Sequence, residues 1–416
     1  MDPLTYDAVL ALFDDDEEEF ALVDLVRRSA VVARKHRDGQ NRIMSDYFDE
    51  RPVFSDEHFR RRFRLSRSVF SRVVDCISSS DANFIQKPDA ADRPGLSAIQ
   101  KALSAIRQLA YGAPADSMDE HVRMAETTAL EILKRFCVAV VDSLGDEYLR
   151  APTTQDLSRL LRIGEERGFP GMLGSLDCMH WRWKNCPKGW AGQFTGKEKA
   201  STIVLEAVAD YEGWMWHLFF GMPGSHNDIN VLDRSHLFTD FRDGRAPSVS
   251  YQINGTHYSM GYYLADGIYP PWATLVQTIS NPQSKKKKFF TEAQESARKD
   301  VERAFGMLQS QYAILTRPCR LWSEEDMAYI VKACVILRHM AIEHERDPDG
   351  IIFERSVQFS IPSSSTVVTA PNRSTDRAFT SFIGRYKAIR SCELHCQLRN
   401  DLIEYLWARS GNQNAQ

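Results

Sequence analysis

Five short runs of apolar, β-branched and aromatic residues, bounded by Gly and Pro, lie between residues 171 and 280. Runs of this length and composition predict β-strands. A strongly amphipathic helical pattern follows at 291–313. Strands followed by helices predict a sheet covered by helices, so the middle of the chain is expected to be an α/β layer domain. The five runs are GMLGSLDCMHWRW (171–183), STIVLEAVAD (201–210), GWMWHLFFG (213–221), YYLAD (262–266) and TLVQTI (274–279).

The residues before these strands carry helical patterns. In FRRRFRLSRSVF (59–70), three phenylalanines share one helical face, which leaves several arginines outside it. Apolar residues recur at helical spacing again at 99–110 and 125–141. Short helices with tight connections resemble a helix-turn-helix unit, which reads DNA with its second helix. A plain helical bundle has the same spacing, so both interpretations remain open.

Composition divides the chain into five expected segments. Residues 1–50 combine an acidic run with a basic stretch and predict a flexible arm. Residues 51–150 are the helical, helix-turn-helix-like candidate DNA-binding domain, and 165–345 are the α/β domain. Residues 346–377 are rich in Ser, Thr and Pro and predict a linker. Residues 378–416 are expected to form an amphipathic helix and a tail.

Charge and cysteine content exclude several classes of protein. The 416 residues include 52 Lys and Arg against 56 Asp and Glu, a net charge of −4, so the chain is not a generally basic nucleic-acid coat. No apolar run reaches the roughly 18 residues that a membrane-spanning helix needs, and the acidic N-terminus is unlike a secretory signal. The eight cysteines form no C-x-x-C pair, which is typical of reduced thiols in a cytosolic or nuclear protein.

Four acidic residues stand at or beside the expected strands and helix. Asp177 lies within an apolar run, Asp228 follows a strand in the turn PGSHND, Asp266 ends YYLAD, and Glu302 borders the apolar stripe of the helix at 291–313. A buried carboxylate is costly unless it is paired or bound to a metal ion. Oxygen ligands of this kind suit Mg²⁺ or Mn²⁺, and two such ions can drive phosphodiester displacement. Aspartates at strand ends are also common turn and helix caps, which is the alternative.

Long motifs in this region closely resemble those of the PIF/Harbinger transposases, in the branch called plant transposon protein. The resemblance covers roughly residues 95–345 and implies an RNase H-like fold, DDE-type catalysis, a divalent metal ion and DNA as substrate. The stretch TDFRDGRAPSVSYQINGTHY (239–258) is interpreted as a loop that this branch shares. The motifs are GSLDCMHWRWKNCPKGWAGQFTGKEK (174–199), STIVLEAVAD (201–210), FFGMPGSHNDINVLDRS (219–235), MGYYLADGIYPPWATLVQTIS (260–280) and ARKDVERAFGMLQSQYAIL (297–315).

The resemblance also assigns roles to the acidic residues. Asp177, Asp266 and Glu302 fall on the catalytic positions of the family. The RNase H strand order favours Asp266 as the second aspartate and leaves Asp228 as an auxiliary metal ligand. We expect the carboxylates of Asp177, Asp266 and Glu302 to converge within roughly 4–8 Å, as a two-ion site requires.

Basic residues close to Glu302 in the sequence are candidate DNA contacts. A run of four lysines precedes the helix at 291–313 and is expected in a loop beside the site. Contacts from such side chains to DNA phosphates would make binding sensitive to salt. The lysines could instead be a nuclear-entry signal or a solvated loop. The candidate contacts are Lys285, Lys286, Lys287, Lys288 and Arg298.

The reaction and partners follow from the same resemblance. It implies attack by water on a transposon-end phosphodiester, followed by attack of the freed 3′-hydroxyl on target DNA. It also implies a nuclear protein that forms a homo-oligomer in its active complex and works with a Myb-like DNA-binding partner. Two alternatives remain: a transposase-derived DNA-binding or chromatin-associated protein that no longer cuts, and a phosphoesterase on the same fold.

Overall fold

The sheet that organises the fold has five strands in the order β3-β2-β1-β6-β7. The computed structural model describes residues 34–88, 92, 94–197, 199–346, 367–369 and 378–413. The first three strands are antiparallel, whereas β6 and β7 run parallel to β1. This mixed sheet confirms the predicted α/β class and is consistent with an RNase H-like fold. Its strands are β1 (Met172–Arg182), β2 (Thr202–Ala209), β3 (Met215–Pro223), β6 (Tyr262–Ala265) and β7 (Leu275–Gln277).

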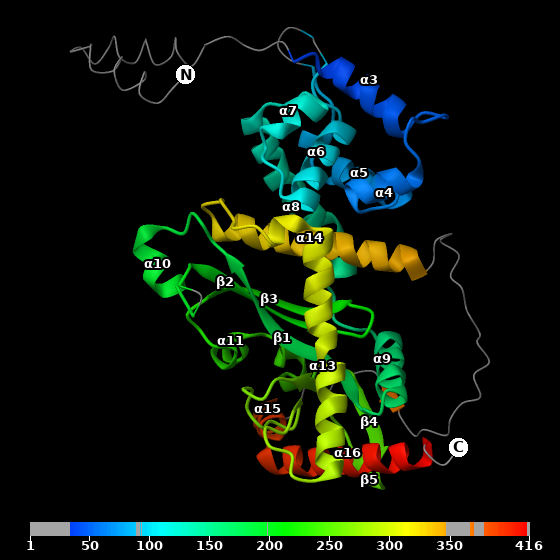
Figure 1. Cartoon of the computed structure of the whole chain (residues 1–416), viewed down its shortest axis with the longest axis vertical. Coiled ribbons are helices and arrows are strands. Elements are labelled where there is room, and N and C mark those ends of the chain that lie inside the picture. The colour runs from blue at the N-terminus through cyan, green and yellow to red at the C-terminus, as the bar shows by residue number, and fades with distance from the viewer. Residues whose placement is uncertain are drawn as a thin grey trace.

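Helices cover both faces of this sheet. Helix α13 (Lys285–Gln311) crosses the sheet over β1, as Figure 1 shows, and α14 (Glu324–Arg346) lies across the end of α13. The short helix α11 (Asp228–Arg234) packs against β2. Every residue of β2 is buried, because strand β2 has a neighbour on each side and helices on both faces. The predicted amphipathic stripe of α13 is buried at Ala297, Val301 and Phe305.

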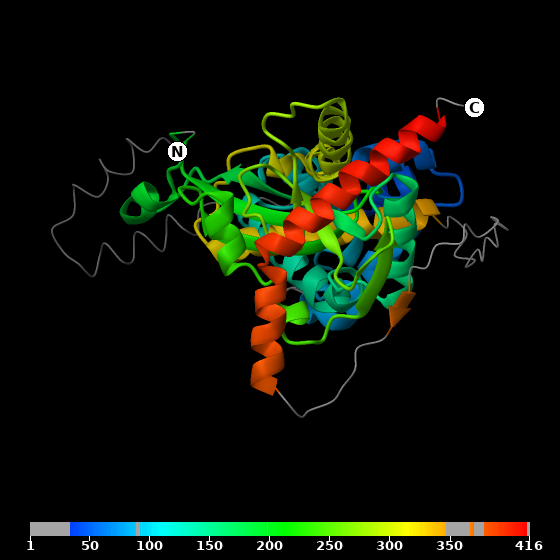
Figure 2. The same cartoon turned by 90° about the horizontal axis from the view of Figure 1, so that it is seen from below.

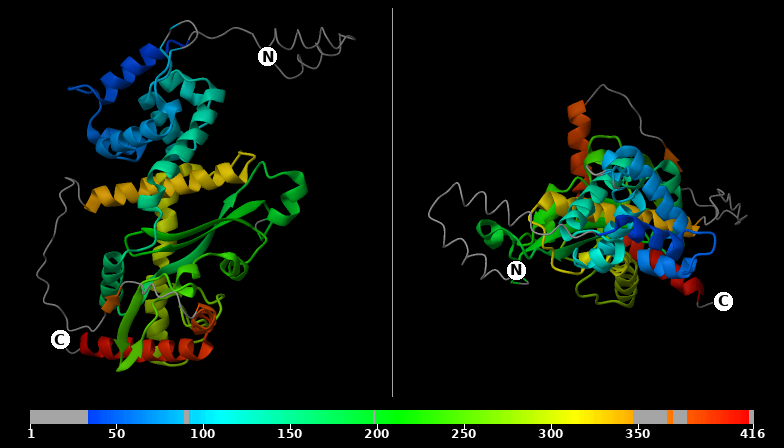
Figure 3. Two further views of the ribbon diagram at one scale, coloured as in Figure 1. Left: turned by 180° about the vertical axis from the view of Figure 1, so that it is seen from behind. Right: turned by 90° about the horizontal axis from the view of Figure 1, so that it is seen from above.

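The N-terminal part is all-helical, as predicted. It is stacked on the side of α14 that faces away from the sheet (Figures 1 and 3). Phe59, Phe63 and Phe70 are buried together. They do not share the face of one helix as predicted, because α4 ends at Phe63 and α5 begins at Arg67. Its elements are α3 (His36–Tyr47), α4 (Asp56–Phe63), α5 (Arg67–Ser80), η1 (Ala82–Phe84), α6 (Ala98–Tyr111), α7 (Ser117–Val122) and α8 (Glu126–Tyr148). Helix α8 packs against α14 and joins this part to the α/β domain, while α9 (Thr154–Glu166) lies against β1.

A second, three-stranded sheet was not expected. It has the order β5-β4-β8 and contains β4 (Ser248–Ile253), β5 (Thr256–Tyr258) and β8 (Val367–Thr369). The interpretation of 239–258 as a loop is therefore wrong, because this stretch forms helix α12 (Thr239–Arg242), β4 and β5. The hairpin turns at Asn254 and Gly255, whose φ angles of 49° and 88° fit a two-residue turn.

The remaining elements include two that fall within segments expected to have no regular structure. Helix α3 falls within the expected arm, most of which lies outside the described residues, and β8 falls within the expected linker. The C-terminal segment forms two helices that meet at an angle in Figure 2, α15 (Ala378–Ile389) and α16 (Cys392–Gln413). Short helices α10 (Lys188–Phe194) and η2 (Ala313–Leu315) follow β1 and α13. Among the described helices, none is long and apolar enough to cross a membrane.

Candidate active site

The sheet brings Asp177 and Asp266 to neighbouring positions on adjacent parallel strands. Ser175 of β1 pairs in register with Leu264 of β6, and the two aspartates stand two residues further along their strands. Asp266 directly follows the last residue of β6, and its Oδ1 accepts a hydrogen bond of 2.6 Å from the backbone N–H of Gly267. The role of Asp266 as the second aspartate stays a prediction.

Helix α13 is held over the same face of β1 that carries Asp177. Alternate residues of a strand share a face, so Ser175 and Asp177 point the same way. The Ser175 hydroxyl donates to the backbone oxygen of Ala297 on α13, at 3.1 Å. Next to Ala297, the guanidinium of Arg298 donates to Asp177 Oδ2 at 3.2 Å and to Glu302 Oε1 at 2.6 Å. Asp177, Arg298 and Glu302 therefore form one ion-paired group between strand and helix.

Asp228 is an electrostatic neighbour of this group. It is the first residue of α11, directly after Asn227, whose side chain caps the helix by accepting from the Asn230 N–H. Burial raises the pKa of Asp228, and the charge of Asp266 acts in the same direction, whereas His180 and the Cys178 thiol lower it. Asp228 in turn raises the pKa of Asp177. The structure thus links Asp228 to both aspartates, and its auxiliary role stays a prediction.

The surroundings of the Asp177 side chain disfavour its negative charge, and the raised pKa of Asp177 reflects this. Burial is the main cause that raises it to about 6, and the charges of Asp228 and Glu302 contribute in the same direction. The Cys178 backbone N–H and Arg298 oppose this rise without cancelling it. Carboxylates with raised pKa values beside other carboxylates are typical of functional sites.

The donor chemistry of the four acidic residues fits Mg²⁺ or Mn²⁺, because all four supply carboxylate oxygens. In the described part of the chain, however, no three Asp, Glu, His or Cys side chains are gathered so that they could hold one ion as they stand. Arg298 lies between two of the four. The predicted metal-ligand roles of Asp177, Asp228, Asp266 and Glu302 therefore remain predictions.

The run of four lysines does not lie beside these carboxylates. It forms the first turn of α13 instead of a preceding loop, and Ser284 caps the helix by accepting from the Lys287 N–H. Lys285 is 17 residues before Glu302, which corresponds to about 25 Å along the helix at 1.5 Å per residue. The expected position of the run is therefore wrong, because the helix begins before its apolar stripe does.

The four lysines differ in their surroundings. Lys286 pairs with Glu404 of α16, so its charge is already partly neutralised. The exposed members of the run are Lys285, Lys287 and Lys288. DNA contact by these side chains stays a prediction, as does DNA contact by Arg298, whose guanidinium faces Asp177 and Glu302.

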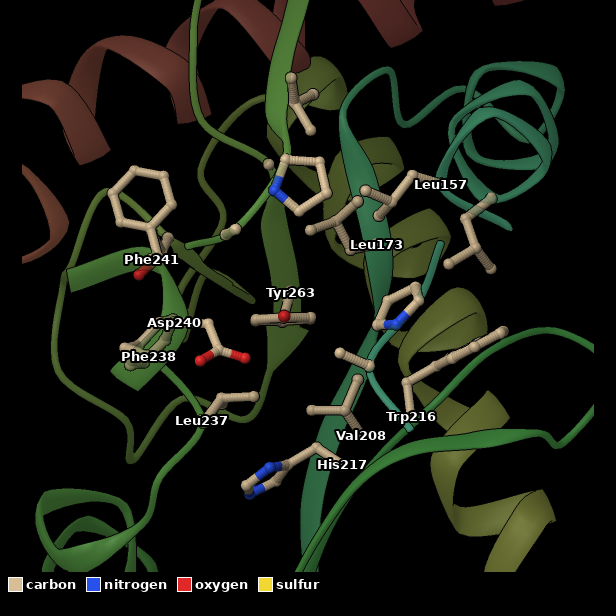
Figure 4. A pocket seen from close by; sticks show the side chains of 18 of the residues that line it. Leu157, Leu173, Val208, Trp216, His217, Leu237, Phe238, Asp240, Phe241 and Tyr263 are labelled. Carbon is tan, nitrogen blue, oxygen red and sulfur yellow. The ribbon is translucent and has the colours of Figure 1, made fainter. Parts of the chain in front are cut away.

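Sequence reasoning missed Glu206, a fully buried carboxylate in β2. Its Oε1 lies 3.0 Å from His217 Nε2, which also lies 2.9 Å from the hydroxyl of Ser235, and its Oε2 has no partner among the described residues. The signal was present, because Glu206 interrupts an apolar run in the same way as Asp177 does. Its partner His217 borders an apolar cavity of about 360 Å³. Figure 4 shows Tyr263 in the middle of the view, with Asp240 on one side and Val208 on the other. None of the four acidic candidates lines this cavity.

Comparison with known proteins agrees with the family motifs in the sequence. The plant transposon protein family matches residues 146–349, a range that contains the whole five-stranded sheet, α13 and α14. The chain belongs to the plant transposon protein family. A domain of unknown function, DUF8418, matches residues 39–78 in the helical part of this family member.

The relatives of this plant transposon family member are distant. "Putative nuclease HARBI1" of Homo sapiens is 19% identical over 299 residues, which cover 70% of this chain and 80% of the relative. The Xenopus laevis protein of the same name is 26% identical over 301 residues, with the same coverage. "Protein ALP1-like" of Arabidopsis thaliana is 24% identical over 308 residues, covering 69% and 71%. No solved structure matches the chain.

Proposed function

We propose that this member of the plant transposon protein family is a metal-dependent DNA endonuclease of the DDE type, a transposase that mobilises a Harbinger-like element in the nucleus. The observation that carries the proposal is the placement of three carboxylates. Asp177 and Asp266 stand on neighbouring parallel strands, and Glu302 is joined to Asp177 through Arg298. The names of the distant nuclease relatives support the same activity.

The proposed reaction assigns a task to each side chain. Asp177, Asp266 and Glu302, with Asp228 as an auxiliary ligand, would hold Mg²⁺ or Mn²⁺, which supplies an activated water and stabilises the leaving oxygen. Asp177 is deprotonated above pH 6, so it is available as a ligand near neutral pH. The water oxygen forms a bond to phosphorus while the bond to the 3′-oxygen breaks, which leaves a free 3′-hydroxyl. That hydroxyl then attacks a target phosphodiester and releases a target 3′-hydroxyl.

The proposal includes the partners that this reaction requires. The substrates are transposon ends and target DNA, and two ends have to be held together, which a homo-oligomer accomplishes. A Myb-like DNA-binding protein would supply part of the sequence recognition. The exposed lysines in the first turn of α13 are candidates for phosphate contacts outside the site.

A second candidate function is DNA or chromatin binding without cleavage. The observation that favours it is Arg298, whose guanidinium is already paired with both Asp177 and Glu302. A protein in which this ion-paired arrangement persisted would keep the fold and the basic surfaces but would bind no catalytic ion.

Cleavage of supercoiled plasmid by the full chain with Mg²⁺ or Mn²⁺ separates these functions. We expect nicking by the wild type and none by Asp177→Asn or Glu302→Gln. Glu295→Gln is the matched control, because Glu295 lies two turns earlier on α13 and accepts a hydrogen bond from the hydroxyl of Thr278. Salt-sensitive DNA binding without nicking would support the second candidate. Hydrolysis of small phosphate esters without DNA affinity would overturn both.

A further inference from the structure

One side chain, Arg298, connects the strand and the helix that carry the proposed metal ligands. Its guanidinium is 15% exposed and contacts one oxygen of Asp177 and one of Glu302, at 3.2 Å and 2.6 Å. Arg298 lies one turn before Glu302 on α13, so both side chains project from the same face of the helix. The single positive charge of Arg298 is thus shared between the carboxylates of Asp177 and Glu302.

We propose that Arg298 is a positioning residue that acts as an exchangeable internal counter-ion: it holds Asp177 and Glu302 together in the ion-free protein and is displaced when a divalent cation binds. This inference rests on the proposed function, since it concerns the same carboxylates. It adds that Arg298 competes with the cation for the carboxylates of Asp177 and Glu302. Binding of the cation is therefore coupled to release of the Arg298 guanidinium.

The contacts of Asp177 explain why Arg298 is the group that moves. Oδ1 of Asp177 accepts the backbone N–H of Cys178 at 2.8 Å, and Oδ2 accepts Arg298. The Cys178 N–H belongs to the central strand β1 and is fixed by the sheet. A cation that takes Oδ2 as a ligand therefore competes with the guanidinium for the negative charge of this oxygen. The long side chain of Arg298 can rotate away while its helix stays in place.

The charge balance around α13 distinguishes Arg298 from a structural ion pair. Asp300, two residues along, is fully buried and is paired with two arginines, Arg167 and Arg303. There, positive charge exceeds negative charge. At Arg298 the order is reversed, because Asp177, Glu302, Asp228 and Asp266 lie together there. The positive groups that act on these four carboxylates are Arg298, Lys197 and the imidazole of His180. The group around Arg298 is thus short of positive charge, and a divalent cation supplies more of it than a guanidinium does.

Binding of Mn²⁺ to the full chain without DNA tests this proposal directly. We expect Arg298→Met, which keeps much of the side-chain length and removes the charge, to bind Mn²⁺ about tenfold more tightly than the wild type, since one competing charge is removed. The ion-free variant is expected to unfold at a lower temperature. Arg298→Lys keeps a charge and is expected to bind Mn²⁺ within about threefold of the wild type. Isothermal titration calorimetry measures the affinity, and thermal unfolding in EDTA measures the stability.

Arg303→Gln is the matched control, because Arg303 is on the same helix but pairs with Asp300 and the Tyr211 backbone. It should leave Mn²⁺ affinity unchanged. Unchanged or weaker Mn²⁺ binding by both Arg298→Met and a second neutral variant, Arg298→Gln, overturns the proposal. If Glu302→Gln abolishes Mn²⁺ binding in that case, the proposed metal site survives and only the role of Arg298 fails. If neither the wild type nor the Arg298 variants bind Mn²⁺, both proposals fail.

Discussion

Replacement of Asp177 by asparagine is expected to stabilise the ion-free protein although it removes an ion pair. The side chain of Asp177 is 20% exposed, and its pKa of about 6 stands above the ordinary value of 3.8. The two values differ by about 2.2, and each unit corresponds to about 1.4 kcal/mol, so the charged carboxylate costs the folded state about 3 kcal/mol. This cost already includes the contact with Arg298, which by itself lowers the pKa of Asp177. The variant should therefore be more stable by up to about 3 kcal/mol near neutral pH.

The same reasoning fixes the sign of the pH dependence. Well below pH 3.8 the carboxyl group of Asp177 is protonated in both the folded and the unfolded protein, so it costs nothing. Because the folded-state pKa is raised, the unfolding free energy of the wild type falls as the pH increases from about 4 to about 6. Asparagine has no charge to lose. The stability advantage of Asp177→Asn should thus be small at pH 4.5 and full at pH 7.5.

Denaturant unfolding in EDTA, followed by circular dichroism at these two pH values, measures the difference. Asp300→Asn is the control for a structural carboxylate. It is fully buried between Arg167 and Arg303, and its replacement should destabilise the fold by about 3–5 kcal/mol because a buried pair is broken. If Asp177→Asn is also less stable than the wild type at pH 7.5, Asp177 is a structural partner of Arg298 and the reasoning about the site is refuted.

Three further predictions concern the fold and the basic surface. Gly171→Ala should lower the unfolding free energy by about 2–4 kcal/mol, since Gly171 has a φ of +87° and an added Cβ would lie 2.1 Å from the ring of Tyr251. An unchanged unfolding free energy would contradict this packing. Burial lowers the pKa of His339 to about 3, so the unfolding free energy should fall as the pH drops from 6.5 toward 3, and denaturant titrations of His339→Gln should show a smaller fall. Replacing all four lysines of 285–288 with glutamine should make the plot of log DNA affinity against log salt concentration less steep, by up to about 3 in slope, because Lys285, Lys287 and Lys288 are exposed. An equal slope in the variant and the wild type would exclude phosphate contact.

The centre of the main sheet was predictable because strand β2 is buried on both faces. Such strands are continuous apolar runs, and STIVLEAVAD, in which every residue of β2 is buried, is the clearest example. The buried stripe of α13 was predictable for a similar reason, since Ala297, Val301 and Phe305 recur at helical spacing. Residues buried in this way form a periodic pattern in the sequence. The pattern can be recognised without knowing which element packs against them.

The second sheet was missed although its signal was present. In β4, the buried residues Val249, Tyr251 and Ile253 alternate with exposed polar residues, which is the pattern of a strand with one solvated face. Asn254 and Gly255 then form the two-residue turn that most strongly indicates a hairpin. Strand β8 adds to β4 from more than 100 residues away, and no local pattern specifies that pairing.

The candidate site was only partly predictable for a physical reason. Sequence patterns predict where strands end, and the strand order that brings Asp177 and Asp266 close together was implied by the family resemblance. The choice of ion-pair partner depends on side-chain directions in three dimensions, and so the bridge from Arg298 to Asp177 and Glu302 was not foreseen. The distance of the lysine run from Glu302 was misjudged because the helix α13 begins earlier than its apolar stripe indicated.

The central claim is that Asp177, Asp266 and Glu302 together hold divalent cations. Anomalous X-ray scattering from crystals of the full chain soaked in Mn²⁺ tests it most directly. We predict a manganese peak that contacts Asp177 and at least one of Asp266 and Glu302, with the guanidinium of Arg298 moved away from Asp177. A structure in which Mn²⁺ is absent from these carboxylates while Arg298 still bridges Asp177 and Glu302 would contradict the claim.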